Sequence, residues 1–177
     1  MTPFTYGEIT FEPIAEILSS LSLEGKSGLT FYDLGSGFGK PCLAAALVLS
    51  KELSRCVGIE YLDGLYDKSL ELKEAYEREV VMGREGYPTI EFKKDDFLKN
   101  TQWANEVDVL FMNATCFEPH MVTSISKTLA EQLKSGAVVI MTTKTLAPDV
   151  EHAFTKNGTV TKEMSWGKAT VNVYFKH

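Results

Sequence analysis

Apolar residues along the chain alternate between helical spacing and short continuous runs. Residues 12–23 place Ile14, Ile17, Leu18 and Leu21 on one side of a helical turn, which predicts a helix near the N-terminus. The later apolar runs are short and continuous, as expected of buried strands. The predicted strands are 29–32, 56–60, 90–93, 107–112 and 137–141.

Segments of helical character separate these strands. A helix should begin at Pro41, because proline is tolerated in the first helical turn. A long charged helix is predicted over residues 64–81 and ends near Gly83, where the chain needs a residue that can leave the helix. Another helix is predicted over residues 118–133. Strand and helix therefore alternate through most of the chain.

The end of the chain predicts a short helix and two closing strands, 160–164 and 170–175, with Gly167 in the connection between them. Strand–helix units that precede two closing strands indicate an α/β fold with a Rossmann-like, seven-stranded mixed sheet. In such a fold the last strand runs antiparallel and helices cover both faces. No repeat or linker interrupts the 177 residues, so a single domain is expected.

Composition is that of an ordinary globular domain, with 44% hydrophobic residues. The longest apolar run, 43–49, is far shorter than the ~20 residues that span a bilayer, and no signal peptide is visible. Cys42, Cys56 and Cys116 are dispersed and do not cluster with histidine, so neither a disulfide framework nor a metal site is expected. These features favour a reducing compartment, cytoplasmic or nuclear, and no membrane association.

The net charge of −6 argues against nucleic-acid binding, which needs a basic surface to hold phosphate. The charge is compatible with a basic partner, such as a lysine- or arginine-rich protein segment. Mild acidity that only keeps the protein soluble is an equally acceptable interpretation. We therefore expect no direct contact with nucleic acid.

A glycine-rich loop, Asp33-Leu34-Gly35-Ser36-Gly37-Phe38-Gly39, separates the first predicted strand from the helix at Pro41. The dinucleotide-binding fingerprint would need a third glycine where Lys40 stands. A P-loop would need four residues between its glycines, and here three residues separate Gly35 from Gly39. The loop therefore matches neither phosphate-binding motif.

The loop does fit the cofactor site of class I S-adenosylmethionine-dependent methyltransferases. Asp33 directly follows an apolar strand and can accept hydrogen bonds around the cofactor. Small loop residues would let the backbone approach the adenosine and methionine moieties, since only glycine lacks a Cβ atom. The loop residues assigned to cofactor binding are Gly35, Ser36, Gly37 and Gly39.

Two further acidic positions complete this interpretation. Glu60 ends the second predicted strand, where a carboxylate can bind both ribose hydroxyls of a nucleoside. Asp96 and Phe97 follow the third strand, where an acid can accept the adenine amine and an aromatic ring can pack on the base. An ordinary turn with a core aromatic would explain Asp96 and Phe97 alone, but Asp33 and Glu60 favour the cofactor site.

Short motifs in a fixed order narrow the assignment further. They are residues 6–11, 31–39, 57–60 and 96–98, Asn113 with Phe117, Lys144 with Ala147-Pro148, and Ser165-Trp166. With these motifs the chain resembles the non-SET histone lysine methyltransferases, the disruptor-of-telomeric-silencing family, over nearly its whole length. The pairing of Tyr6-Gly7-Glu8 with Ser165-Trp166 is more specific than the glycine loop.

The resemblance implies that residues 1–24 form a gating loop and helix, and that residues 25–177 form the catalytic core. Tyr6 and Glu8 of the gating loop would bind the cofactor and close over its methionine end. The implied activity is methyl transfer from S-adenosylmethionine to an exposed lysine of a protein, which leaves S-adenosylhomocysteine.

The resemblance also implies the catalytic residues. Asn113 would lie beside the sulfonium of the cofactor, at the mouth of a narrow channel. Phe117 and Trp166 would line the channel that admits the lysine side chain, and Tyr6 would join the catalytic residues by closing over the methionine end of the cofactor. Such a channel favours a neutral amine by desolvation, and its ring faces can hold the methylated cation.

Two departures from the family pattern concern the channel. The family's two adjacent asparagines and aromatic become Asn113-Ala114-Thr115, and the tyrosine of its last strand aligns with Val173. The chain also lacks the helical N-terminal extension and the basic tail that would hold nucleosomal DNA. Nucleosome binding is therefore not expected, and a non-histone target stays open.

Other functions stay open as alternatives. A small-molecule N- or O-methyltransferase would use the same cofactor loop, although such enzymes usually carry an inserted lid. A non-catalytic S-adenosylmethionine-binding domain would keep the loop without turnover. A nucleic-acid amino-methyltransferase would carry Pro-Pro and an aromatic after the fourth strand, where Ala114 and Thr115 stand instead.

Overall fold

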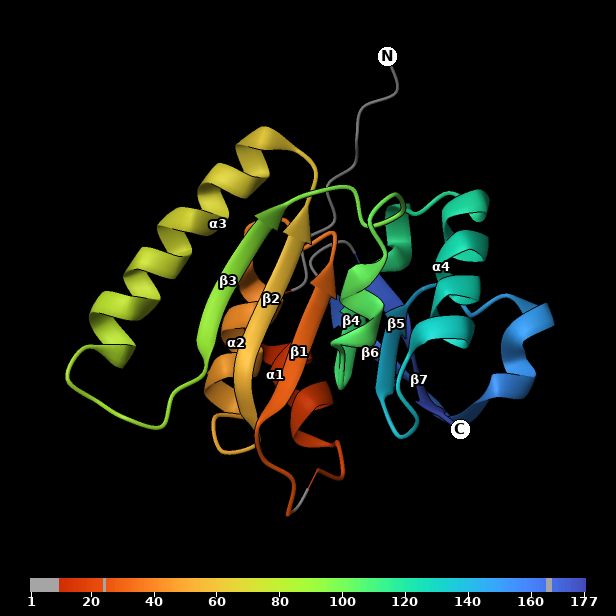
Figure 1. Ribbon diagram of the computed structural model, residues 1–177, viewed down its shortest axis with the longest axis horizontal. Coiled ribbons are helices and arrows are strands. Elements are labelled where there is room, and N and C mark those ends of the chain that lie inside the picture. Colours follow the sequence, from red (N-terminus) through yellow and green to blue (C-terminus); the bar gives the residue numbers. More distant parts are fainter. Residues whose placement is uncertain (1–9, 24, 165–166) are drawn as a thin grey trace.

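A computed structural model describes residues 10–23, 25–164 and 167–177 of the chain (Figure 1). Its centre is a seven-stranded sheet with the strand order β3-β2-β1-β4-β5-β7-β6. The strands are β1 Leu29–Leu34, β2 Leu53–Glu60, β3 Thr89–Lys94, β4 Val109–Met112, β5 Val138–Thr142, β6 Phe154–Met164 and β7 Gly167–Lys176. The sequence predicted this mixed sheet, and the structure confirms it.

Strand direction follows the predicted pattern. β1 pairs in parallel with β2 and β4, β2 with β3, and β4 with β5. β7 runs antiparallel to β5, with Val138 opposite Phe175 and Thr142 opposite Val171. β6 pairs only with β7 among the described strands, so it forms one edge of the sheet. The carboxyl ends of β1, β2, β4 and β5 consequently meet at one end of the sheet.

Helices lie on both faces of the sheet. The α-helices are α1 Phe11–Ser19, α2 Lys40–Val48, α3 Asp63–Tyr76 and α4 Pro119–Gln132. Apolar residues of α1, α2 and α3 pack on one face with Phe31, Phe111 and Ile140. α4 packs on the other face with Leu110 and Val139, together with two 3-10 helices, Gln102–Asn105 and Pro148–Ala153. Each face of the sheet therefore has its own hydrophobic core.

Several element boundaries differ from the prediction. The first helix ends at Ser19 instead of residue 23, and the hydroxyls of Ser19 and Ser20 donate to carbonyls of its last turns. β6 begins at Phe154 instead of residue 160. Most of its side chains are exposed, so β6 is defined by pairing with β7 rather than by apolar residues. Gly167 opens β7 instead of lying in the connection.

Charged side chains cover part of the second face. The described connection between β3 and β4 contains the short 3-10 helix Gln102–Asn105 and no α-helix. Arg55 on β2 bridges Glu91 of β3 at 2.7 Å and Glu106 at 3.0 Å. The hydroxyl of Tyr32 donates to Glu106 at 2.6 Å, and burial raises the pKa of that phenol. An ion-pair network therefore covers the sheet where a helix is absent.

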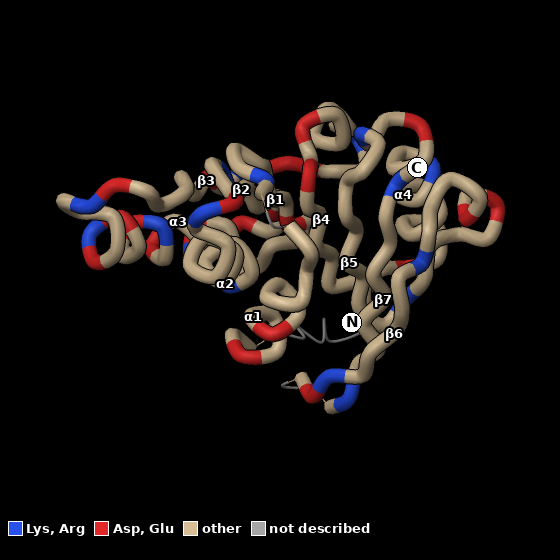
Figure 2. Tube along the Cα trace, turned by 90° about the horizontal axis from the view of Figure 1, so that it is seen from below, with Lys and Arg blue, Asp and Glu red and all other residues tan. Residues whose placement is uncertain are grey.

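Surface charge is mixed rather than segregated over the long helix. Figure 2 shows Asp and Glu interspersed with Lys and Arg along α3. Lys68 pairs with Glu71 one helical turn away on this helix, and Lys73 pairs with Glu77, the first residue of the π-helix Glu77–Val81 that follows it. Within the described ranges, no helix is both long and apolar enough to cross a membrane.

Candidate active site

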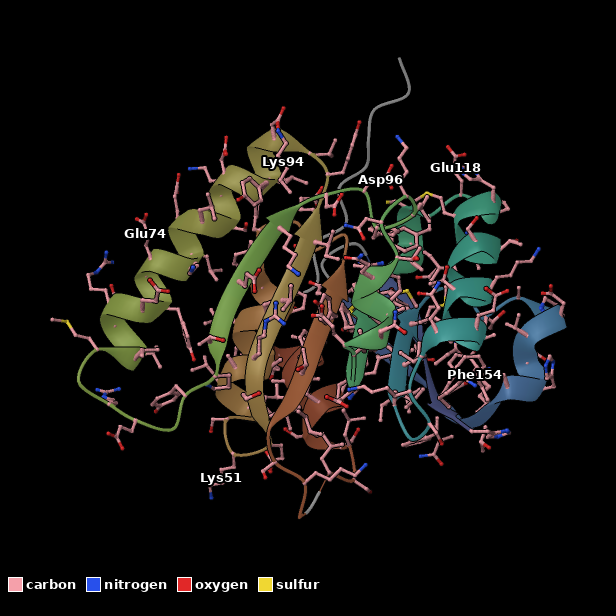
Figure 3. The ribbon with its side chains drawn as sticks, viewed as in Figure 1. Lys51, Glu74, Lys94, Asp96, Glu118 and Phe154 are labelled. Carbon is pink, nitrogen blue, oxygen red and sulfur yellow. The ribbon has the colours of Figure 1, made fainter. Side chains whose placement is uncertain are left out.

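Polar residues gather where the parallel strands end. Figure 3 shows Asp96 and Glu118 at the end of the sheet to which the arrowheads of β1, β2 and β3 point, whereas Lys51 lies at the opposite end. Open α/β sheets bind ligands at the carboxyl ends of their strands. The site lies between the two neighbouring strands from which the chain continues in opposite directions across the sheet. In this sheet the reversal lies between β1 and β4. The candidate site is therefore the carboxyl end of these two strands and their neighbours.

Strand alternation places four polar side chains on the same face of the sheet. Phe31, Cys56, Phe111 and Ile140 all belong to the core beneath α1, α2 and α3. Every second residue of a strand points to the same face. Asp33, Glu60, Asn113 and Thr142 follow those four core residues by two or four positions. These four polar side chains therefore lie at the carboxyl ends of β1, β2, β4 and β5, on that face of the sheet.

The glycine loop is held tightly over the end of β2. The amides of Gly35 and Ser36 both donate to the carbonyl of Ile59, at 2.9 and 3.0 Å. Gly35, Gly37 and Gly39 have φ values of 74°, 54° and 87°, in the left-handed region that favours glycine. Backbone conformation thus accounts for the glycines that the sequence singled out.

Phe92 of β3 explains why Gly39 and Gly58 have no side chain. A Cβ atom on Gly39 would lie 2.2 Å from Cζ of Phe92, and one on Gly58 would lie 2.6 Å from its Cδ1. The same atom on Gly58 would lie 2.6 Å from Oγ of Ser36. The buried ring of Phe92 therefore supports the loop from below. Sequence reasoning missed this residue, although its place two residues after Ile90 marked it as inward-facing.

Two buried polar atoms of the loop have no partner among the described residues. Oδ2 of Asp33 and Oγ of Ser36 have no hydrogen-bond partner within the described part of the chain. Both residues are nearly inaccessible, with 1% and 4% of their surfaces exposed. Unpaired buried polar atoms are costly, so their retention points to a bound group. Burial, and then the nearby Glu60, raise the pKa of the Asp33 carboxyl well above its usual value.

Glu60 already serves as an acceptor for two backbone amides. Its Oε2 accepts from the amide of Gly37 at 2.8 Å, and its Oε1 accepts from the amide of Leu62 at 2.8 Å. The carboxylate is thereby fixed between the glycine loop and the start of α3. Each carboxylate oxygen has further lone pairs, so Glu60 keeps acceptor capacity for a ligand.

Asp96 and Phe97, which follow β3, form another side of the candidate site. Oδ1 of Asp96 accepts from the amide of Leu98 at 3.0 Å, which closes a local turn. Phe97 is buried, and its ring centroid lies 5.7 Å from that of Phe117. A Cβ atom on Gly35 would lie 3.6 Å from the ring of Phe117. The structure thus brings Phe117 beside Phe97 and over the glycine loop.

Asn113 lies in a cluster of threonine hydroxyls that the sequence did not reveal. Its Oδ1 accepts from Oγ1 of Thr142 at 2.7 Å and from Oγ1 of Thr115 at 2.8 Å. Oγ1 of Thr115 also lies 2.9 Å from Oγ1 of Thr143. Thr142 and Thr143 follow the last apolar residue of β5, and this position at the carboxyl end was the available signal.

Thr143 has a left-handed backbone, with φ of 66°. It is the one non-glycine residue with positive φ in the described part of the chain. A β-branched residue in this region stores about 1–3 kcal/mol of strain. Its amide donates to the carbonyl of Thr170 at 2.7 Å, so β7 holds the strained turn in place.

Some expected site residues lie outside the described residues, namely Tyr6, Glu8 and Trp166.

Val173 packs against the core beneath α1 and lines a groove of about 290 Å³ with Ile17 and Phe175. No cluster of three or more metal-binding side chains occurs within residues 10–23, 25–164 and 167–177.

Comparison with known sequences identifies related proteins. Residues 1–174 match the sequence model of the family described as histone methylation protein DOT1. A Caenorhabditis elegans protein named histone-lysine N-methyltransferase, H3 lysine-79 specific, is 29% identical over 146 residues, which cover 80% of this chain and 15% of that protein. A Gibberella zeae protein of the same name is 26% identical over 142 residues, 78% of this chain and 28% of that protein. The chain spans less than a third of the length of these relatives.

Solved structures establish the fold. N-methyltransferase NodS from Bradyrhizobium japonicum WM9 has a TM-score of 0.65 at 12% identity and covers 94% of this chain and 96% of its own. The putative methyltransferase yhhF from Escherichia coli has a TM-score of 0.68 at 11% identity and covers 100% of this chain and 90% of its own. The chain therefore has the Rossmann-like fold of class I methyltransferases.

Proposed function

The chain belongs to the histone methylation protein DOT1 family, and on that premise we propose that it transfers a methyl group from S-adenosylmethionine to the side-chain amine of a protein lysine. The observation that carries the proposal is the combination of this family match with the unpaired buried atoms of Asp33 and Ser36 in the glycine loop. In a loop that binds nothing, burial of these two atoms would cost free energy that no hydrogen bond offsets.

The residues at the carboxyl end fit the cofactor. Among the described residues, Asp33 and Ser36 offer buried polar atoms without partners, and Gly35 between them is exposed. Glu60 offers carboxylate lone pairs for ribose hydroxyls. Asp96 would accept the adenine amine, while Phe97 and Phe117 would pack on the base. We assign Phe117 to the adenine side because its ring lies beside Phe97 and Gly35.

When bound, the cofactor supplies a methyl carbon attached to a positively charged sulfur. The protein must then present an unprotonated amine, since an ammonium has no lone pair. Alignment is the main requirement, which is catalysis by proximity. We propose that Asn113 orients the reacting groups, that Trp166 lines the channel for the lysine, and that Tyr6 closes over the methionine end of the cofactor and excludes water. Asn113 carries an amide and does not act as a base.

The substrate proposed is a lysine in a basic protein segment. The two relatives are named as specific for lysine 79 of histone H3, which makes histone H3 the first candidate. The net charge of −6 supports a basic partner. Since the chain spans 15% and 28% of those relatives, non-histone proteins belong in the same screen.

Calorimetric titration with S-adenosylmethionine, and separately with NAD, tests the cofactor. We expect binding of the first alone. Transfer of radiolabelled methyl groups to histone octamers, free histone H3 and other basic proteins then tests the reaction. Label on lysine supports the proposal. Binding without label on any protein would support a non-catalytic cofactor-binding domain instead, and label on a small molecule would change the substrate class.

A further inference from the structure

Two threonine hydroxyls converge on one atom of the proposed reaction centre. Oγ1 of Thr142 lies 2.7 Å from Oδ1 of Asn113, and Oγ1 of Thr115 lies 2.8 Å from the same atom. Thr142 ends β5, whereas Thr115 belongs to the 3-10 helix Ala114–Cys116. The amide of Asn113 is therefore held by two separate elements of the fold.

The number of hydroxyl protons decides which threonine donates in the contact between Thr115 and Thr143. A threonine hydroxyl has a single proton to donate. Thr115 donates its proton to Asn113, so the contact of 2.9 Å between Thr115 and Thr143 requires Thr143 to be the donor. The donors therefore form a chain from Thr143 through Thr115 to Oδ1 of Asn113. Linked hydrogen bonds polarise and strengthen one another.

This arrangement fixes the orientation of the amide. Two donors occupy Oδ1 of Asn113, and the amide group is planar, so the direction of its Nδ2–H bonds follows from the same two contacts. We propose that Thr142, Thr115 and Thr143 are positioning residues that hold the amide of Asn113 in the orientation needed for methyl transfer. The inference rests on the function proposed above, because it deepens the role of Asn113 in that reaction.

The backbone of Thr143 provides an independent argument. The left-handed conformation at this position favours glycine, yet a β-branched threonine stands there. A glycine would make the same turn with less strain. The hydroxyl of Thr143, directed to Thr115, is the property that glycine would lose. Strain of this kind concentrates at functional sites.

Thr142 gives the first pair of variants. Thr142→Val keeps the shape of the side chain and removes its hydroxyl, whereas Thr142→Ser keeps the hydroxyl. We expect Thr142→Val to lower kcat by roughly tenfold or more through misalignment. The KM for the protein substrate and the calorimetric Kd for S-adenosylmethionine should change less than twofold, and Thr142→Ser should restore most of kcat. A structural role would instead move stability and cofactor affinity together.

Thr143→Gly separates positioning from stability. We expect a thermal midpoint equal to or above that of the wild-type protein, because the strain is relieved, together with a fall in kcat. Thr159→Val is the matched control, since Thr159 donates to a different side-chain amide, Oδ1 of Asn172, at 3.0 Å. The control should keep the wild-type kcat.

Nuclear magnetic resonance reports directly on the side-chain amide of Asn113. The Nδ2 signals of Asn113 are assigned by their loss in Asn113→Ala, and we expect them to shift in Thr142→Val and Thr143→Gly but not in Thr159→Val. Unchanged kcat and unchanged signals in Thr142→Val would overturn the inference while wild-type methyl transfer still stands. Absence of methyl transfer by the wild-type protein would instead overturn the proposed function.

Discussion

The ring of Phe92 occupies the space into which a side chain at Gly39 would project, with only 2.2 Å between its Cζ and the Cβ that an alanine would carry. Phe92 stands 53 positions after Gly39 in the sequence, yet its ring leaves room only for a glycine there. The shape of the proposed cofactor site therefore depends on a buried core residue outside the glycine loop.

Gly39→Ala should consequently weaken S-adenosylmethionine binding at least roughly tenfold, equivalent to about 1.4 kcal/mol, because the loop must move away from Phe92. Gly86 is a matched control, since it has the same φ of 87° but a Cβ atom there would meet no atom within 4 Å among the described residues. Both variants incur backbone strain, which thermal melting measures. Equal loss of cofactor affinity in the two variants would contradict the role of Phe92.

The pH dependence of stability should carry a signature of Asp33. Its folded-state pKa is raised by burial and by Glu60. Below the ordinary pKa near 3.8 the carboxyl is protonated in both states and has no effect. As pH rises above that value the unfolded chain releases the proton first, so this residue lowers stability until the raised pKa is passed.

Asp33→Asn removes this contribution. The variant should therefore melt at a higher temperature than the wild-type protein at pH 7, and the difference should disappear near pH 3. The same variant should bind S-adenosylmethionine more weakly, since a carboxyl oxygen proposed to accept hydrogen bonds from the cofactor is replaced by an amide NH₂, which only donates. Melting curves over a pH series, with calorimetry at pH 7, check both parts. A lower melting temperature at pH 7 would contradict the unpaired state of Asp33.

Asn113→Ala should separate binding from chemistry. Cofactor affinity should stay within about twofold of wild type, whereas turnover should fall by roughly a hundredfold, as expected when an orienting group is removed. Calorimetry and single-turnover methyl transfer measure the two quantities. A fully active variant would show that the reaction centre lies elsewhere. Gly37→Arg serves as the opposite control, because it should abolish cofactor binding.

Phe117→Ala distinguishes two roles of this ring. The sequence expectation places Phe117 in the lysine channel, whereas its contact with Phe97 favours the adenine side. On the adenine side its loss should weaken S-adenosylmethionine binding about fivefold, or about 1 kcal/mol, with little change in KM for the protein. The reverse pattern, an increased protein KM at unchanged cofactor Kd, would assign the ring to the channel.

Local sequence was sufficient for the part of the site built on strand ends. Asp33 and Glu60 each follow an apolar strand, and parallel strands bring their carboxyl ends to the same edge of a sheet. The positive φ values of Gly35, Gly37 and Gly39 likewise need only local geometry. The glycine loop and the order of elements could therefore be predicted from the chain alone.

The tertiary structure decided what depends on the register between distant segments. Phe92 meets Gly39 because β3 pairs with β2, and Thr142 meets Asn113 because β5 pairs with β4. β6 is a long strand only because β7 supplies its partners. Side-chain type and local spacing determine which residues lie at a strand end. Which of them touch one another is set by hydrogen bonding between strands, and no local pattern encodes that register.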